Sequence, residues 1–243
     1  MSSLGHVAGV WRYPASSLAG ERLASIDIGL DGVAGDRQFG VIETATGAPG
    51  RPDADRKWHG LPRIRTRLEG GALSVAVPGG DWLPAPGTAC DLALSGFMGF
   101  GVTLLPFSRE AAPGHDGPLT QSRYGVAAVH LLTTASLAEL DSQDEGGADP
   151  RRFRPNILVD MPRVAGRFPE TEWIGRKLAI GEVELTVSEP CRRCGFTIVG
   201  QDGFDDDPAI LRQIVRRNQR NMGVYCTVDR PGRVAPGDEM RFA

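Results

Sequence analysis

The chain contains the run Leu178-Ala179-Ile180-Gly181-Glu182-Val183-Glu184-Leu185-Thr186-Val187, which leads into Pro190-Cys191-Arg192-Arg193-Cys194-Gly195. Large apolar side chains alternate with other residues on both sides of Gly181-Glu182, at Leu178 and Ile180 and then at Val183, Leu185 and Val187. This period is typical of a β-strand with one buried face. We therefore expect one strand over 178–187 that delivers the cysteine loop to the edge of a sheet.

The rest of the sequence favours the same class of structure. Its 32 glycines and 18 prolines interrupt many short apolar runs, a pattern typical of short strands joined by turns rather than of long helices. We expect a mostly β protein with a few helices. Expected strands are 7–12, 21–28, 38–43, 66–68, 72–77, 101–106, 129–132, 157–160 and 223–228. Expected helices are 133–140 and 207–215, the second with Asp207 as N-cap and Pro208 in its first turn.

A polar segment at 108–125, rich in proline and glycine, is predicted to be a loop or an interdomain linker. It divides the chain into two expected domains, 1–107 and 108–243. The bulk properties predict a cytoplasmic protein: the net charge of −3 gives no reason to expect nucleic acid as a partner. We also expect no membrane association, because no apolar run is long enough to cross a bilayer, and we see no signal peptide.

The cysteine loop has two possible interpretations. A thiolate is a nucleophile and a ligand for soft metals, and adjacent guanidinium groups lower the pKa of a thiol, so the loop could be a reactive or metal-binding site. Alternatively, one cysteine fills the core and the two arginines are solvated. Zinc is not expected, because the other cysteines and the histidines lack ligand spacing. Pyridoxal phosphate is not expected either, because Lys57 and Lys177, the two lysines, lie in charged, turn-like surroundings.

Two further segments could bind an anion. If 151–156 is extended, alternation places Arg152, Arg154 and Asn156 on one face, where guanidinium groups suit a phosphate; the alternative is a solvated strand edge. The turn Gly35-Asp36-Arg37, with Tyr13-Pro14-Ala15-Ser16-Ser17 upstream, could bind an anion through hydroxyl and backbone N–H groups. Ordinary turn chemistry explains this segment better than an anion site does.

Taken together and in this order, these segments resemble the MOSC family, named for the C-terminal domain of molybdenum cofactor sulfurases. The matching residues are Tyr13-Pro14 with Ser17, Gly35-Asp36-Arg37, Leu131–Leu137, Arg152-Phe153-Arg154-Pro155-Asn156, Cys191-Arg192-Arg193-Cys194, and Pro231-Gly232 with Gly237-Asp238. The similarity extends to members with an N-terminal β-barrel domain, including the mitochondrial amidoxime-reducing component. It implies a MOSC β-barrel domain with a smaller β-rich N-terminal domain.

The resemblance also implies a site. Cys194 would ligate molybdenum or carry a persulfide, while Cys191 would be structural. The molybdenum cofactor (molybdopterin) would be bound by Ser16, Ser17, Arg37, Arg152, Arg154, Asn156 and Arg193. The chain departs from relatives that reduce N-hydroxylated compounds at two positions: Ser16 replaces a lysine, and Gly125 stands in place of an aspartate.

Two activities follow as hypotheses. The first is a molybdenum-dependent oxidoreductase that reduces an N-oxygenated or S-oxygenated small molecule, with electrons from a partner protein. The second is a sulfur carrier that receives sulfur on Cys194 from a cysteine desulfurase and binds no molybdenum. A non-catalytic binding module is a third reading.

Overall fold

The stretch at 178–187 forms a hairpin rather than one strand, so that prediction is wrong. Strands β12 (Lys177–Ile180) and β13 (Val183–Arg192) pair antiparallel, with Leu178 opposite Leu185. Gly181 turns the chain between them with a φ of 55°, a conformation that glycine adopts without strain. The turn keeps the apolar side chains of both strands on one face, which is why the hairpin looks like one alternating run.

These two strands belong to a closed seven-stranded β-barrel. The computed structural model describes residues 3–108, 110, 128–140, 148–163 and 167–243. Within them the strand order is β11-β10-β14-β13-β12-β16-β1, and β1 pairs back onto β11. The other barrel strands are β1 (Ser3–Arg12), β10 (Val129–Thr133), β11 (Ile157–Asp160), β14 (Asn221–Arg230) and β16 (Glu239–Phe242). The expected mostly β fold with a β-barrel is confirmed.

Apolar side chains fill the barrel interior. Along β13, Val183, Leu185 and Val187 are completely buried, and Val224 and Cys226 of β14 join them in the same core. Since side chains on a strand alternate between faces, the residues between these point outward, toward whatever packs on the barrel. Tyr225 and His130 are such outward residues, opposite each other on β14 and β10.

Strand β1 lies within the first expected domain, yet it completes the barrel by pairing with β11 and β16. The first strand of the chain therefore belongs to the same sheet as strands from its second half. The boundary between 107 and 108 stays a prediction, and most of the expected linker, 111–125, lies outside the described residues.

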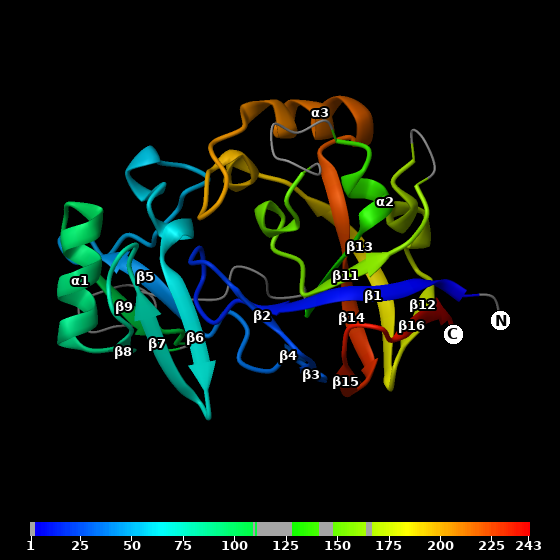
Figure 1. Ribbon diagram of the computed structural model, residues 1–243, viewed down its shortest axis with the longest axis horizontal. Coiled ribbons are helices and arrows are strands. Elements are labelled where there is room, and N and C mark those ends of the chain that lie inside the picture. Colours follow the sequence, from blue (N-terminus) through cyan, green and yellow to red (C-terminus); the bar gives the residue numbers. More distant parts are fainter. Residues whose placement is uncertain (1–2, 109, 111–127, 141–147, 164–166) are drawn as a thin grey trace.

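A second lobe has its own apolar core (Figure 1). It contains β5 (Phe39–Glu43) paired with β9 (Val102–Pro106), and the meander β6 (Arg65–Glu69), β7 (Ala72–Ala76) and β8 (Leu83–Ala85). Helix α1 (Thr88–Met98) packs beside β9 and was not expected. Only Cys90 and Leu94 of this helix are buried, so it carries too narrow an apolar stripe to be recognised from its sequence.

Helices α2 (Thr134–Leu137) and α3 (Pro208–Asn218) cover the barrel, and α3 lies at the top of Figure 1. Helix α3 begins as predicted: the Asp207 carboxylate accepts a hydrogen bond from Ala209 N at 2.9 Å. The remaining elements are β2 (Glu21–Leu23), β3 (Ile26–Gly29), β4 (Gly32–Val33), β15 (Gly232–Val234) and the 3₁₀ turns η1 (Arg56–Trp58), η2 (Leu61–Arg63), η3 (Pro150–Arg152), η4 (Pro169–Trp173) and η5 (Gly195–Ile198). The strand expected over 21–28 is thus two strands, β2 and β3.

Candidate functional site

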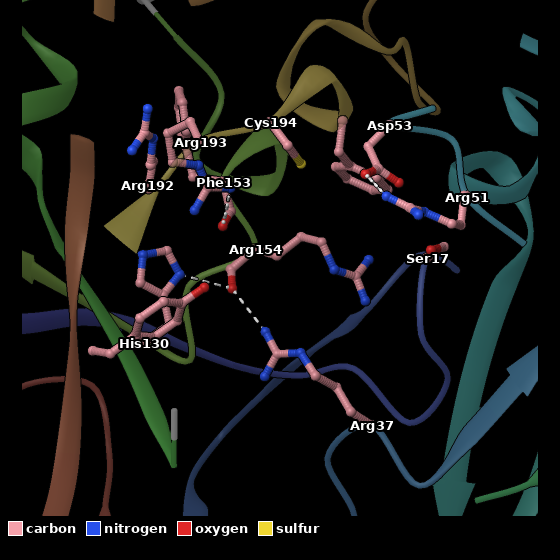
Figure 2. Close-up of a pocket in the computed structure, with 12 residues that line it drawn as sticks. Ser17, Arg37, Arg51, Asp53, His130, Phe153, Arg154, Arg192, Arg193 and Cys194 are labelled. Atoms are coloured by element: carbon pink, nitrogen blue, oxygen red, sulfur yellow. Dashed lines mark hydrogen bonds and ion pairs between the residues drawn. The ribbon is translucent and has the colours of Figure 1, made fainter. Parts of the chain in front are cut away.

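A pocket of about 210 Å³ lies where the two lobes meet (Figure 2). The barrel side contributes His130, Phe153, Arg154, Arg192, Arg193, Cys194, Phe196 and Tyr225, and the N-terminal side contributes Ser17, Arg37, Arg51 and Asp53. Five of these twelve residues are arginines and one is a carboxylate. The pocket is therefore strongly cationic, and its chemistry suits an anionic ligand.

Cys194 is partly exposed and lines this pocket. It follows the end of β13 and is the N-cap of η5, with an extended backbone. Its carbonyl accepts hydrogen bonds from the side chain and N–H of Thr197, which tie the loop to the next turn. The other cysteine of the pair, Cys191, is completely buried in β13. Only the second cysteine can meet a ligand in the pocket.

Arg154 connects the two lobes. Its guanidinium donates to the carbonyl oxygens of Leu18 and, at 3.3 Å, Ala15. It also lies over the ring of Tyr13, 4.1 Å from the centroid. Arg154 has a left-handed backbone, with a φ of 55°. Much of its hydrogen-bonding capacity thus holds the 15–18 loop against the barrel.

Arg37 lines the pocket and is also left-handed, with a φ of 49°. Its guanidinium forms an ion pair with Asp36, and the other carboxylate oxygen of Asp36 accepts from Tyr13 N at 2.6 Å. The predicted Gly35-Asp36-Arg37 turn therefore orients an arginine toward the pocket. Burial raises the pKa of Tyr13 well above its usual value, against the lowering effect of Arg154 and Arg37.

Residues 151–156 are not extended, so the prediction of one shared face is wrong. The segment forms η3 and then turns at Arg154. Arg152 is completely buried, donates to Asp205 O at 2.7 Å and stacks 4.1 Å from the Phe204 ring centroid.

Asn156 is also buried, and its side chain accepts from His130 N and donates to Trp11 O. The structure brings Ser17, Arg37, Arg154, Arg193 and Cys194 together and places Ser16, Arg152 and Asn156 outside the pocket lining. Roles for these eight residues in binding a cofactor stay predictions. Gly125, the second departure from the relatives, lies outside the described residues.

Two pocket residues from the second lobe, Arg51 and Asp53, are absent from the sequence-based set. They belong to a loop rich in glycine and proline. Charged residues are common in such loops, so nothing in this segment marks the two residues as part of a site. Arg51 Nη2 lies 3.1 Å from an oxygen of Asp53. The loop rests directly on the cysteine segment, since a Cβ added to Gly195 would lie 2.9 Å from Asp53 O.

The guanidinium of Arg193, which the resemblance places among the cofactor-binding residues, contacts the buried Cys191. Its Nη1 donates to the sulfur of Cys191 at 2.7 Å and its Nη2 to Phe153 O at 2.9 Å. Burial alone would raise the pKa of Cys191, but the charge of Arg193, followed by His130, lowers it to about 6. Arg192, in contrast, is exposed and lines the pocket.

The described residues contain no group of three or more His, Cys, Asp or Glu that could hold a metal ion. In the same residues, no helix is long and apolar enough to cross a membrane.

Comparison with known proteins agrees with this architecture. The chain is 28% identical to mitochondrial amidoxime reducing component 2 of Bos taurus over 144 residues, which is 54% of this chain and 41% of that protein. It is 29% identical to molybdenum cofactor sulfurase of Drosophila pseudoobscura pseudoobscura over 151 residues, 58% of this chain and 18% of that protein. The matched regions thus span less than half the length of either relative.

Among solved structures, the YUAD protein from Bacillus subtilis is similar, with a TM-score of 0.48 and 16% identity over 97% of this chain and 93% of that one. Residues 113–241, more than half of the 243, match the MOSC domain. Together with the closed barrel and the partly exposed cysteine after β13, this match shows that the chain belongs to the MOSC family.

Proposed function

We propose that this protein binds a molybdenum cofactor, with Cys194 as the protein's ligand to the metal, and reduces an N-oxygenated or S-oxygenated small molecule. The observation that carries the proposal is the position of the Cys194 thiol in a pocket with five arginines. The name of the insect relative supplies the class of cofactor, and the name of the bovine relative supplies the class of reaction.

The residues present fit such a group. A thiolate is a soft ligand suited to a transition metal, and arginine forks bind phosphate oxygens in pairs. Within the described residues, the side chain of Arg192 makes no hydrogen bond or ion pair, so its guanidinium donors are available. Arg51 is half exposed at the pocket wall. It offers a cation in a chain that has Ser16 in place of the lysine of its relatives.

The remaining residues define how the pocket would work. When bound, the cofactor supplies the two-electron chemistry that removes an oxygen atom from a substrate. Reduction of an N–O or S–O bond consumes two electrons and two protons and releases water, and a partner protein must supply the electrons. Arg154 holds the 15–18 loop in place, and Phe153 and Phe196 give the wall an apolar part that limits access of water.

Metal analysis tests the proposal directly. Protein made in a host that synthesises the cofactor should contain molybdenum near one atom per chain, and C194A should lose it. C90A is the matched control, because Cys90 is buried in the core of the second lobe; it should keep the metal. Absence of molybdenum from the wild-type protein, or unchanged reductase activity in C194A, would contradict the proposal.

The alternative is a sulfur carrier with a persulfide on Cys194. The departure at Ser16 favours it, since a missing lysine weakens one phosphate contact without affecting sulfur transfer to a thiol. After incubation with a cysteine desulfurase and cysteine, mass spectrometry should find one added sulfur on the Cys194 peptide. The alternative fails if that peptide carries no sulfur while the desulfurase is active on a control acceptor.

A further inference from the structure

The most unusual sulfur in this protein is not in the pocket but just behind its wall. Cys191 is completely buried in β13, three positions before Cys194. Arg193 Nη1 donates to its sulfur at 2.7 Å. His130 of β10 and Tyr225 of β14 also act on the sulfur and on its ionisation. All three of these neighbours line the pocket, so Cys191 links three parts of one wall.

The pKa of Cys191 differs from the pKa values of the other buried cysteines. Burial raises the pKa of Cys226 to about 12 and the pKa of Cys90 to about 11. Cys191 is buried as completely as Cys226. Its pKa nevertheless falls to about 6, because the guanidinium of Arg193 and then His130 and Tyr225 outweigh the cost of burial. A buried cation is stable only with an anion nearby. Here the sulfur of Cys191 lies beside the guanidinium of Arg193, in the position that a carboxylate usually occupies.

We infer that Cys191 is a buried thiolate that pairs with Arg193 and fixes this arginine in the wall of the pocket, which makes Cys191 a positioning residue rather than core filler. The pair also neutralises one of the five pocket arginines. This inference does not depend on molybdenum or on the proposed reaction.

The surroundings of Arg193 explain why its position matters. Its N–H donates to Arg220 O at 2.8 Å, and its carbonyl accepts from Arg220 Nε at 2.5 Å. With Nη2 on Phe153 O, the residue is held at its backbone and at both ends of its guanidinium. Since Arg193 directly precedes Cys194, this fixation also sets where the exposed thiol emerges.

A series of substitutions tests the charge. Aspartate is close to cysteine in volume and is an anion, serine is polar but neutral, and alanine is apolar. If Cys191 is a thiolate, C191D should have a higher Tm than C191A and C191S at pH 7.5. Cys226 is the matched control: there, C226D should fall below C226A by about 10 °C, because burial alone shifts the pKa of that thiol and no described cation lowers it. A C191D protein less stable than C191A would overturn the inference.

A spectroscopic measurement covers the case in which the Cys191 variants fail to fold. In C194S, thiolate absorbance near 240 nm should rise with a midpoint at about pH 6 and be largely complete by pH 8, since Cys90 and Cys226 titrate much higher. The groups facing Cys191 are Arg193, His130 and Tyr225. If no thiolate absorbance develops below pH 8 in folded C194S, Cys191 is a neutral thiol and the inference is wrong.

The effect on the pocket has its own readout. Cys194 can be modified with an anionic aromatic disulfide and with a neutral one. Loss of the Cys191 anion makes the pocket more positive, so the ratio of anionic to neutral reaction rates should rise about threefold in C191A and return in C191D. An unchanged ratio in C191A would contradict a charged Cys191. This result is independent of metal content, so it separates failure of the inference from failure of the proposed function.

Discussion

The pocket arginines differ in whether their guanidinium groups already donate hydrogen bonds to other parts of the protein. Arg154 is buried and donates to two carbonyl oxygens of the 15–18 loop. Arg192 is exposed and makes no such bond in the described part of the chain. Removal of a buried guanidinium leaves its acceptors without hydrogen bonds. Removal of an exposed guanidinium leaves no buried group unpaired, because its former partners were water molecules. The first arginine therefore supports the structure, and the second is available for a ligand.

Replacement of Arg154 by alanine should lower the free energy of unfolding by about 2–4 kcal/mol. R154K should recover part of this loss, because lysine keeps the charge but cannot donate to both carbonyls. R192A should change stability by less than about 0.5 kcal/mol. Urea denaturation measures all three. Equal stability of R154A and R192A would show that the link to the 15–18 loop contributes nothing.

At the scale of elements, the cysteine segment and the loop that carries Arg51 are packed backbone against backbone. Gly195 has no room for a side chain, because an added Cβ would lie 2.9 Å from Asp53 O. Gly96 in α1 has nothing within 4 Å of the same position. Replacement by alanine should therefore have opposite effects on stability at Gly195 and at Gly96.

G195A should destabilise the protein by about 1–3 kcal/mol, since one of the two segments must shift. G96A should stabilise it by about 0.5–1 kcal/mol, because alanine favours a helix interior. Thermal unfolding of both variants gives the comparison. A G195A protein as stable as the wild type would mean that the loop moves freely away from η5.

Helix α3 packs on η5, the turn that Cys194 caps. D207A removes the acceptor for Ala209 N and should cost about 1 kcal/mol, while D207N should cost less, because asparagine is also a good cap. Chemical denaturation of the two variants tests the cap. If D207N loses as much as D207A, the charge of Asp207 matters more than its hydrogen bond.

At the scale of the whole molecule, Glu170 makes stability depend on pH. It is completely buried between η4, α2 and β10, and Thr133 and Ser136 donate to its carboxyl group at 2.8 and 2.6 Å. Burial is the largest influence and raises its pKa above the ordinary 4.5, against the hydrogen bonds. The folded protein therefore favours the protonated form.

For an acid with a raised pKa in the folded state, the stabilising contribution is complete below the unfolded value and is lost as the pH rises through the folded value. E170Q should accordingly be more stable than the wild type at pH 7–8, with a smaller difference near pH 4. Tm values across this range test the prediction. Parallel curves of Tm against pH for the two proteins would show that the pKa of Glu170 is the same in the folded and the unfolded state.

The candidate site was only partly predictable. Cys194, Arg37 and Arg154 are expected from the sequence and line the pocket. Cys194 and Arg37 follow a strand end and a turn that are recognisable locally. Arg152 and Asn156 were expected to share a face with Arg154, but η3 turns them into the protein. Arg51 and Asp53 were missed, since their approach to Cys194 depends on how two distant segments pack.

The sequence by itself determined the class of fold, the short strands, the capped start of α3 and the cysteine pair, because periodicity and capping act between near neighbours. Tertiary structure alone decided that 178–187 is a hairpin, that β1 closes the barrel and that loop 51–53 faces Cys194. It also decided which cysteine is the anion. Burial and the nearby guanidinium of Arg193 set that charge, and neither can be read from the spacing of two cysteines.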